Sequence, residues 1–114
     1  MDNKSYQDHF FKKAKASGYR SRSAFKLIEL NNKFNFLKNG TNVLDVGSYP
    51  GGWCQVIKKK ISNGKILGID LKKTNQIDEV KFIEGDFYSD DVKMAIKKYF
   101  HSNIDLILSD MAPN

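Results

Sequence analysis

The chain has 114 residues and a mass of 13.0 kDa, and 40% of its residues are hydrophobic and 28% are charged. This length allows a single domain and this composition supports a packed core, which excludes a multidomain protein and a disordered tail. The formal net charge is +6 and there is one cysteine, so an internal disulfide is excluded and a partner of negative charge is expected.

The positive charge is concentrated near the N-terminus. Residues 1–40 contain nine Lys and Arg against three acids, an excess of +6, whereas residues 41–114 contain ten of each and are neutral. A neutral body with a basic arm is typical of a protein that binds a polyanion, although a merely solvated lysine-rich surface would have the same composition. No stretch resembles a membrane span or a signal peptide, so we expect an intracellular, soluble protein, in a compartment that the sequence does not resolve.

Helical periodicity predicts two helices in the basic arm, over residues 6–16 and 21–34. The second helix has an apolar stripe, interrupted once by a polar residue, that should pack against the body: Ala24, Leu27, Ile28, Asn31 and Phe34. Arg22 and Lys26 lie one turn apart on the opposite side of this helix. Two cations should therefore project together from an anchored helix.

The body alternates strand and helix signals. Apolar runs predict four strands, at residues 43–46, 65–70, 80–84 and 104–109. Helical periodicity predicts one helix beginning near Trp53 and another over residues 90–100, with a loop at residues 72–79. This order predicts a doubly wound α/β fold with a mostly parallel sheet, whose ligand site lies at the carboxyl ends of the strands.

The segment VLDVGSYPGGW, residues 43–53, is the strongest candidate for a ligand site. Gly47, Gly51 and Gly52 let the backbone approach a ligand closely, and the following helix N-terminus should present free N–H groups to it. Such a turn can also be a bare connection, so it does not decide the question alone. Three acids lie at or just past the ends of the later strands and should meet Gly47 at one rim: Asp70, Asp86 and Asp110.

Several motifs together closely resemble the FtsJ family of S-adenosylmethionine-dependent RNA ribose 2′-O-methyltransferases. They are DVGSYPGGW, ILGID, GDF and SDMAPN, preceded by GYRSRSAFKL, and the resemblance covers residues 12–114. It implies a Rossmann-like methyltransferase fold of which four strands are present, with a basic RNA-facing arm at residues 1–40 and the N-terminal part of the methyltransferase domain at residues 41–114. The implied reaction is methyl transfer to a ribose 2′-hydroxyl of RNA. The favoured substrate is large-subunit ribosomal RNA, methylated at a uridine, and tRNA is the alternative.

The resemblance also implies roles for particular residues. The turn residues expected to bind S-adenosylmethionine are Gly47, Pro50, Gly51, Gly52 and Trp53. Asp70 is implied on the ribose hydroxyls and Asp86 on the adenine amino group, with Phe87 on the adenine face or, alternatively, in the core. Lys26 matches the first catalytic lysine, and Asp110 matches the catalytic aspartate that also borders the cofactor. The cations expected to contact RNA phosphates are Lys12, Lys13, Lys15, Arg20 and Arg22.

The chain departs from the family pattern in two places. Ser48 and Tyr49 replace two small residues of the glycine turn, so the Tyr49 ring should point away from the cofactor. The family's second catalytic lysine and its glutamate come from later strands that this sequence lacks. Because the strand at residues 104–109 would then be an apolar edge, we expect these 114 residues to be part of a longer, monomeric chain and to be inactive and poorly stable alone.

Two other interpretations remain open at this point. A catalytically incomplete, RNA-binding methyltransferase-like module would explain the missing lysine and glutamate. A dehydrogenase-type dinucleotide site would also place an acid where Asp70 lies, but the turn is not GxGxxG. His9 and His101 are isolated and Cys54 is alone, so we expect no metal site and a packing role for Cys54.

Overall fold

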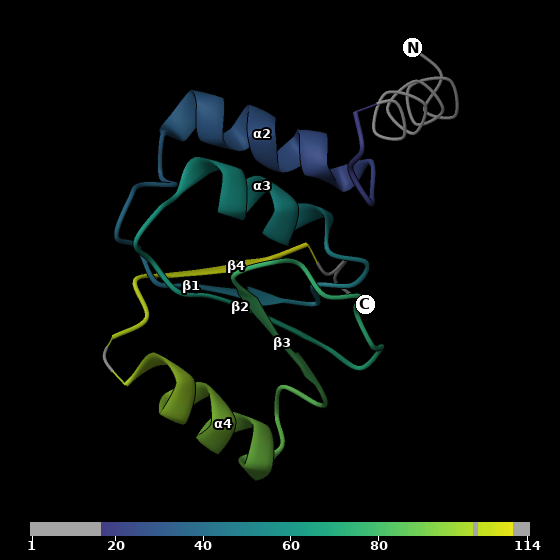
Figure 1. The fold of residues 1–114 in the computed structure, drawn as a ribbon, viewed down its shortest axis with the longest axis vertical. Coiled ribbons are helices and arrows are strands. Elements are labelled where there is room, and N and C mark those ends of the chain that lie inside the picture. The colour runs from purple at the N-terminus through teal and green to yellow at the C-terminus, as the bar shows by residue number, and fades with distance from the viewer. Residues whose placement is uncertain (1–16, 102, 111–114) are drawn as a thin grey trace.

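The fold is a parallel β-sheet covered by helices on both faces (Figure 1). This computed structural model describes residues 17–101 and 103–110. The strands, in the sheet order β3-β2-β1-β4, are β3 (Val80–Glu84), β2 (Ile66–Asp70), β1 (Val43–Val46) and β4 (Leu106–Ser109). The described helices are α2 (Ser23–Phe34) and α3 (Gly52–Lys60) on one face and α4 (Asp90–Phe100) on the other. None of these described helices is long and apolar enough to cross a membrane.

The predicted α/β order is confirmed, and the differences from prediction lie at the ends of elements. β1, β3 and α4 have the predicted bounds, and β2, β4 and α2 begin one or two residues late. β4 begins late because Asp105 pairs with a loop residue: its Oδ2 accepts the Asn42 N–H at 2.8 Å, and its own N–H donates to the Asn42 carbonyl at 2.9 Å. The helix predicted over residues 6–16 lies outside the described residues.

Apolar side chains form one cluster on each face of the sheet. Leu27 of α2, Val43 of β1 and Ile57 of α3 are fully buried in the first cluster. Leu67 of β2 and Phe100 of α4 belong to the second cluster. Because β1 and β2 contribute to both clusters, their sequences are almost continuously apolar, as expected for strands between two helical layers.

The predicted stripe on α2 is confirmed except at its end. Leu27 is fully buried, and the polar Asn31 is buried because its Oδ1 accepts the Leu37 N–H at 2.9 Å, beyond the end of the helix. Phe34 was predicted to pack on the body but is 63% exposed. It is the last helical residue, and Asn35 then takes a left-handed conformation with φ 50°, which turns the chain away from the helix axis.

We expect Leu27→Ala and Phe34→Ala to differ sharply in stability. Removing the fully buried Leu27 side chain leaves a cavity and should lower the free energy of unfolding by about 2–5 kcal/mol. Phe34→Ala should change it by less than about 0.5 kcal/mol because most of that side chain is already in water. Urea unfolding of both variants measures the difference, and equal losses would contradict the position of Phe34.

Candidate cofactor and catalytic site

The carboxyl ends of the strands meet at one edge of the sheet. Val46, the last residue of β1, pairs with Ile69 of β2 on one side and with Ser109 of β4 on the other. The residues that follow each strand therefore emerge at the same rim, as predicted. Seven predicted site residues line two adjoining cavities there: Gly47, Gly52, Trp53, Asp70, Asp86, Phe87 and Asp110.

The larger rim cavity has a volume of about 340 Å³, a size suited to a small organic ligand. Its walls combine apolar side chains with two carboxylates: Val46, Ile69, Leu71, Phe87, Tyr88, Asp70 and Asp86. Phe87 was predicted either on the adenine face of the cofactor or in the core. It borders this cavity and also packs against the second apolar cluster. An apolar pocket with few polar groups can hold a planar ring and orient its polar edge.

Backbone amides orient the two carboxylates of this cavity. Asp70 accepts the Tyr49 N–H through Oδ2 at 3.0 Å and the Lys72 N–H through Oδ1 at 2.9 Å. Asp86 accepts the Tyr88 N–H through Oδ1 at 2.9 Å. Because each carboxylate oxygen has more than one acceptor position, both aspartates can still accept hydrogen bonds from a ligand. The Tyr49 ring lies beside Lys72, whose Nζ is 5.2 Å from the ring centroid.

Glycine is needed at the start of α3 because other parts of the chain approach closely there. Gly51 has φ +113°, and a Cβ at this position would lie 3.0 Å from Arg20 Nη1. A Cβ on Gly52 would collide with the Ser21 side chain. Gly52 lines the smaller rim cavity, whereas Gly51 and Pro50 are not among the described residues that line either cavity. Their contact with a cofactor stays a prediction.

Arg20 has a role that the sequence did not predict. Its Nη1 donates to the carbonyls of Asn75 at 2.6 Å and Pro50 at 3.3 Å, and its Nη2 donates to the Gln76 carbonyl at 3.1 Å. Arg20 was predicted to contact RNA phosphates, and that contact stays a prediction, because a guanidinium has five N–H donors and these three hydrogen bonds use three of them. Arg20 also joins the basic arm to the glycine turn and to the loop at residues 71–79.

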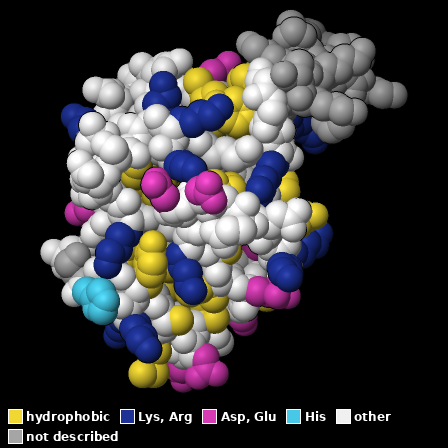
Figure 2. Space-filling view, in the orientation of Figure 1, with side chains coloured by type: hydrophobic (Ala, Val, Ile, Leu, Met, Phe, Trp, Pro, Cys, Tyr) yellow, Lys and Arg dark blue, Asp and Glu magenta, His cyan; other side chains and the backbone are white. Residues whose placement is uncertain are grey.

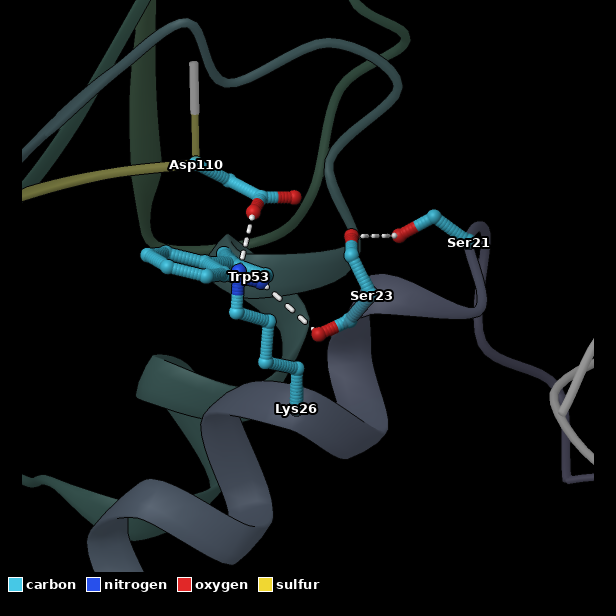
Figure 3. Close-up of polar contacts among 5 residues, drawn as sticks. All are labelled: Ser21, Ser23, Lys26, Trp53 and Asp110. Atoms are coloured by element: carbon cyan, nitrogen blue, oxygen red, sulfur yellow. Dashed lines mark hydrogen bonds and ion pairs between the residues drawn. The ribbon is translucent and has the colours of Figure 1, made fainter. Parts of the chain in front are cut away.

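The two predicted catalytic residues meet at the rim although they are 84 residues apart (Figure 3). Lys26 Nζ lies 3.4 Å from Asp110 Oδ1, and the two side chains are 65% and 31% exposed. The first turn of α2, which carries Lys26, is held by Trp53, whose Nε1–H donates to the Ser23 carbonyl at 2.8 Å. Ser21 and Ser23 share a hydroxyl hydrogen bond of 2.9 Å. Lys26 thus presents an exposed ammonium from a fixed helix end.

A buried acid that the sequence did not indicate as functional lies beneath this pair. Asp45 of β1 is 1% exposed, and burial raises its pKa to about 7. The hydrogen bond from Cys54 lowers this pKa, and the nearby charges of Asp110 and Asp70 raise it by smaller amounts. The Cys54 Sγ donates to Asp45 Oδ2 at 3.4 Å. Cys54 is confirmed as a packing residue, and burial raises the pKa of its thiol well above the usual value.

Asp45 also lines the smaller rim cavity, which is strongly polar. This cavity has a volume of about 20 Å³, enough for about one water molecule or one small polar group. Ser48, which also lines it, is buried, and its Oγ has no hydrogen-bond partner among the described residues. A buried hydroxyl without a partner normally pairs with a water or a ligand atom, so this cavity is suited to a polar occupant.

The remaining predicted residues divide by position. Lys12, Lys13 and Lys15 lie outside the described residues, and Arg22 is exposed at the start of α2. Within the part of the chain that the structure describes, no group of three or more His, Cys, Asp or Glu side chains is arranged to hold a metal ion.

The parallel sheet, the glycine turn and the acids at the strand ends define a Rossmann-like α/β protein with a cavity at the carboxyl rim, where ligands of such folds bind. A sequence profile of FtsJ-like methyltransferases matches residues 19–114. The chain therefore belongs to the FtsJ-like methyltransferase family.

Individual relatives agree with this family. The chain is 50% identical over 107 residues to a ribosomal RNA large subunit methyltransferase E of Novosphingobium aromaticivorans. The aligned segment covers 94% of this chain and 48% of that protein. The protein of the same name from Pelagibacter ubique is 41% identical over 98% of this chain and 55% of its own length. The crystal structure of a ribosomal RNA methyltransferase from Plasmodium falciparum has a TM-score of 0.77 and 46% identity, over 84% of this chain and 58% of that one. The chain spans about half the length of the curated relatives it matches.

We expect Arg20→Ala to loosen the loop at residues 71–79. Losing the guanidinium leaves three carbonyls without their donor, so the free energy of unfolding should fall by about 1–3 kcal/mol. Hydrogen–deuterium exchange of the loop amides should become faster. Arg22→Ala, at an exposed neighbouring arginine, is the matched control and should change stability by less than about 0.5 kcal/mol. Unchanged exchange in Arg20→Ala would contradict the role of Arg20 in holding the loop.

The buried Asp45 predicts a pH dependence of stability. With a pKa near 7 in the folded state and 3.8 as its ordinary value, Asp45 keeps a proton that the unfolded chain releases between these pH values. The stability that the folded state gains by keeping this proton is fully present below about pH 4 and is lost as pH rises toward 7. The free energy of unfolding of the wild type should therefore fall relative to that of Asp45→Asn, by up to about 1.4 kcal/mol per pH unit. Urea unfolding from acid to neutral pH tests this, and a constant difference between the two proteins would disprove the raised pKa.

Proposed function

We propose that the protein transfers a methyl group from S-adenosylmethionine to the 2′-hydroxyl of a ribose in RNA, and that this RNA is large-subunit ribosomal RNA. The observation that carries the proposal is the Lys26–Asp110 pair, at the same rim as a cavity lined by Gly47, Asp70 and Asp86. The names of the relatives support ribosomal RNA as the substrate class. Because the chain spans about half of those proteins, the proposal concerns the whole protein.

S-adenosylmethionine fits the chemistry of the larger rim cavity. Asp70 offers acceptors for the two ribose hydroxyls, and Asp86 offers one for the adenine amino group. Phe87 supplies an apolar wall suited to the adenine face. When bound, the cofactor supplies a methyl group that is already activated by a positively charged sulfur.

The chain's own residues then have to position the acceptor hydroxyl and stabilise charge. Lys26 presents its ammonium at the rim, where it can bind the 2′-hydroxyl oxygen or the adjacent phosphate. Asp110 fixes that ammonium through the ion pair of 3.4 Å. In the family pattern a second lysine lowers the pKa of the hydroxyl, and no residue of these 114 matches it.

RNA has to approach a rim that is rich in carboxylates. We propose that the exposed Arg22 and the arm lysines Lys12, Lys13 and Lys15 bind its phosphates and offset this repulsion. Such contacts fix the position of the RNA without specifying its sequence. The 2′-hydroxyl is the element that distinguishes RNA from DNA.

Lys26→Ala and Asp110→Asn should each lower methyl transfer by about 100-fold or more in the whole protein, because each disrupts the group that positions the acceptor. The affinity of Lys26→Ala for S-adenosylmethionine, measured by calorimetry, should stay close to that of the wild type, because Lys26 lines neither rim cavity. Asp86→Ala is the complementary variant and should weaken cofactor binding by about 10-fold or more.

Two outcomes would contradict this proposal. Full methyl transfer by Lys26→Ala would show that the Lys26–Asp110 ion pair is not needed for the reaction. A wild-type protein that binds RNA and S-adenosylmethionine without transferring methyl would instead favour the catalytically incomplete RNA-binding module.

A further inference from the structure

A second concave surface extends from the amino ends of β2 and β3 along α4. It is a groove of about 550 Å³ between α4 and the β2–β3 side of the sheet. We call it the basic groove, and its main lining residues are Lys65, Lys81, Lys98, His101, Ile83 and Tyr99. Figure 2 shows lysines around hydrophobic side chains on the lower part of this face, with the one described histidine at its border.

The charge of the basic groove is not compensated locally. No carboxylate lines it, and neither Lys81 nor Lys98 has an acidic partner among the described residues. Lys65 is held in place, because its Nζ donates to the Tyr99 carbonyl at 2.9 Å and lies 5.4 Å from the Tyr99 ring centroid. The groove therefore combines fixed and free ammonium groups over an apolar floor.

Helix stability explains only part of this arrangement. Lys97 and Lys98 lie in the last turn of α4, where cations stabilise the helix dipole. Lys65 precedes β2 and Lys81 lies in β3, so neither has that role. Their convergence with Lys98 on one concave surface points to an anionic ligand.

We propose that the basic groove binds a single-stranded segment of the same RNA, with phosphates on Lys81 and Lys98 and a base against the floor formed by Ile83 and Tyr99. This inference rests on the proposed function for the identity of the RNA. Cations that track a backbone beside an aromatic surface are typical of single-strand binding.

The position of the groove sets a requirement on the RNA. Lys65 immediately precedes β2 and Asp70 ends it, so the Lys65 end of the groove lies about 17 Å from Asp70 at the rim. The other end is nearer to the rim, because Ile83 of the groove pairs with Ile69, which lines the larger rim cavity. A single substrate can occupy both sites only if it extends along the side of the body. Large-subunit ribosomal RNA can do so, whereas a short oligonucleotide that carries only the acceptor ribose cannot.

The test compares two double variants of the whole protein that remove the same charge. Lys81→Gln with Lys98→Gln changes the groove, and Lys93→Gln with Lys97→Gln changes two exposed lysines of α4 that do not line it. Affinity for deproteinised large-subunit ribosomal RNA and for a short single-stranded oligonucleotide is measured over a range of salt concentrations. Calorimetry with S-adenosylmethionine checks that the rim is intact.

We expect only the groove variant to lose affinity for the long RNA, with a salt slope smaller by about 1.4 for two lost phosphate contacts. Its affinity for the single-stranded oligonucleotide, which can occupy the groove alone, should also fall, and its affinity for S-adenosylmethionine should not change. Equal losses in both double variants would overturn the proposal, as would loss of self-association in sedimentation without loss of RNA affinity, which would assign the groove to a second copy of the chain. Because binding is measured apart from methyl transfer, a protein that binds RNA through the groove but does not methylate it would contradict the proposed function alone.

Discussion

The parallel pairing of β1 with strands on both of its sides is the constraint on which the rest of the structure depends. Because β1 pairs in register with β2 and β4, the strands stop at the same level and deliver Gly47, Asp70 and Asp110 to one rim. An antiparallel partner would place its following residue at the opposite edge of the sheet. The larger rim cavity and the Lys26–Asp110 pair therefore depend first on the parallel direction of the strands.

The same architecture separates charge along the strand direction. Acids occupy the rim and the first turn of α4, while the last turns of α3 and α4 carry lysines, as the dipoles of these helices favour. Residues 41–114 are neutral in total, yet their two ends differ in sign. The end with the larger rim cavity therefore carries an excess of acids, with the cations of α2 beside it, and the opposite end carries an excess of lysines.

Local patterns predicted most of the fold, and long-range contacts account for most of what they missed. The bounds of α4 followed from its apolar spacing and its acidic first turn. The hydrogen bonds of Arg20 could not be predicted, because its sequence context shows a basic segment but not the carbonyl of Asn75, which lies 55 residues away. The proximity of Lys26 to Asp110 came from the family resemblance alone. Asp45 did leave a signal, since it is an acid inside an otherwise apolar strand between two helical layers.

Arg20 and Trp53 make the position of Lys26 depend on the glycine turn. Trp53, in the first turn of α3, holds the first turn of α2 through the Ser23 carbonyl. Arg20, just before α2, holds Pro50 and the loop that follows β2, whose Lys72 amide orients Asp70. The segment that presents Lys26 and the segment that orients Asp70 are therefore parts of one hydrogen-bonded unit. A displacement of the glycine turn would move both together, and the proposed transfer depends on such a fixed alignment of acceptor and cofactor.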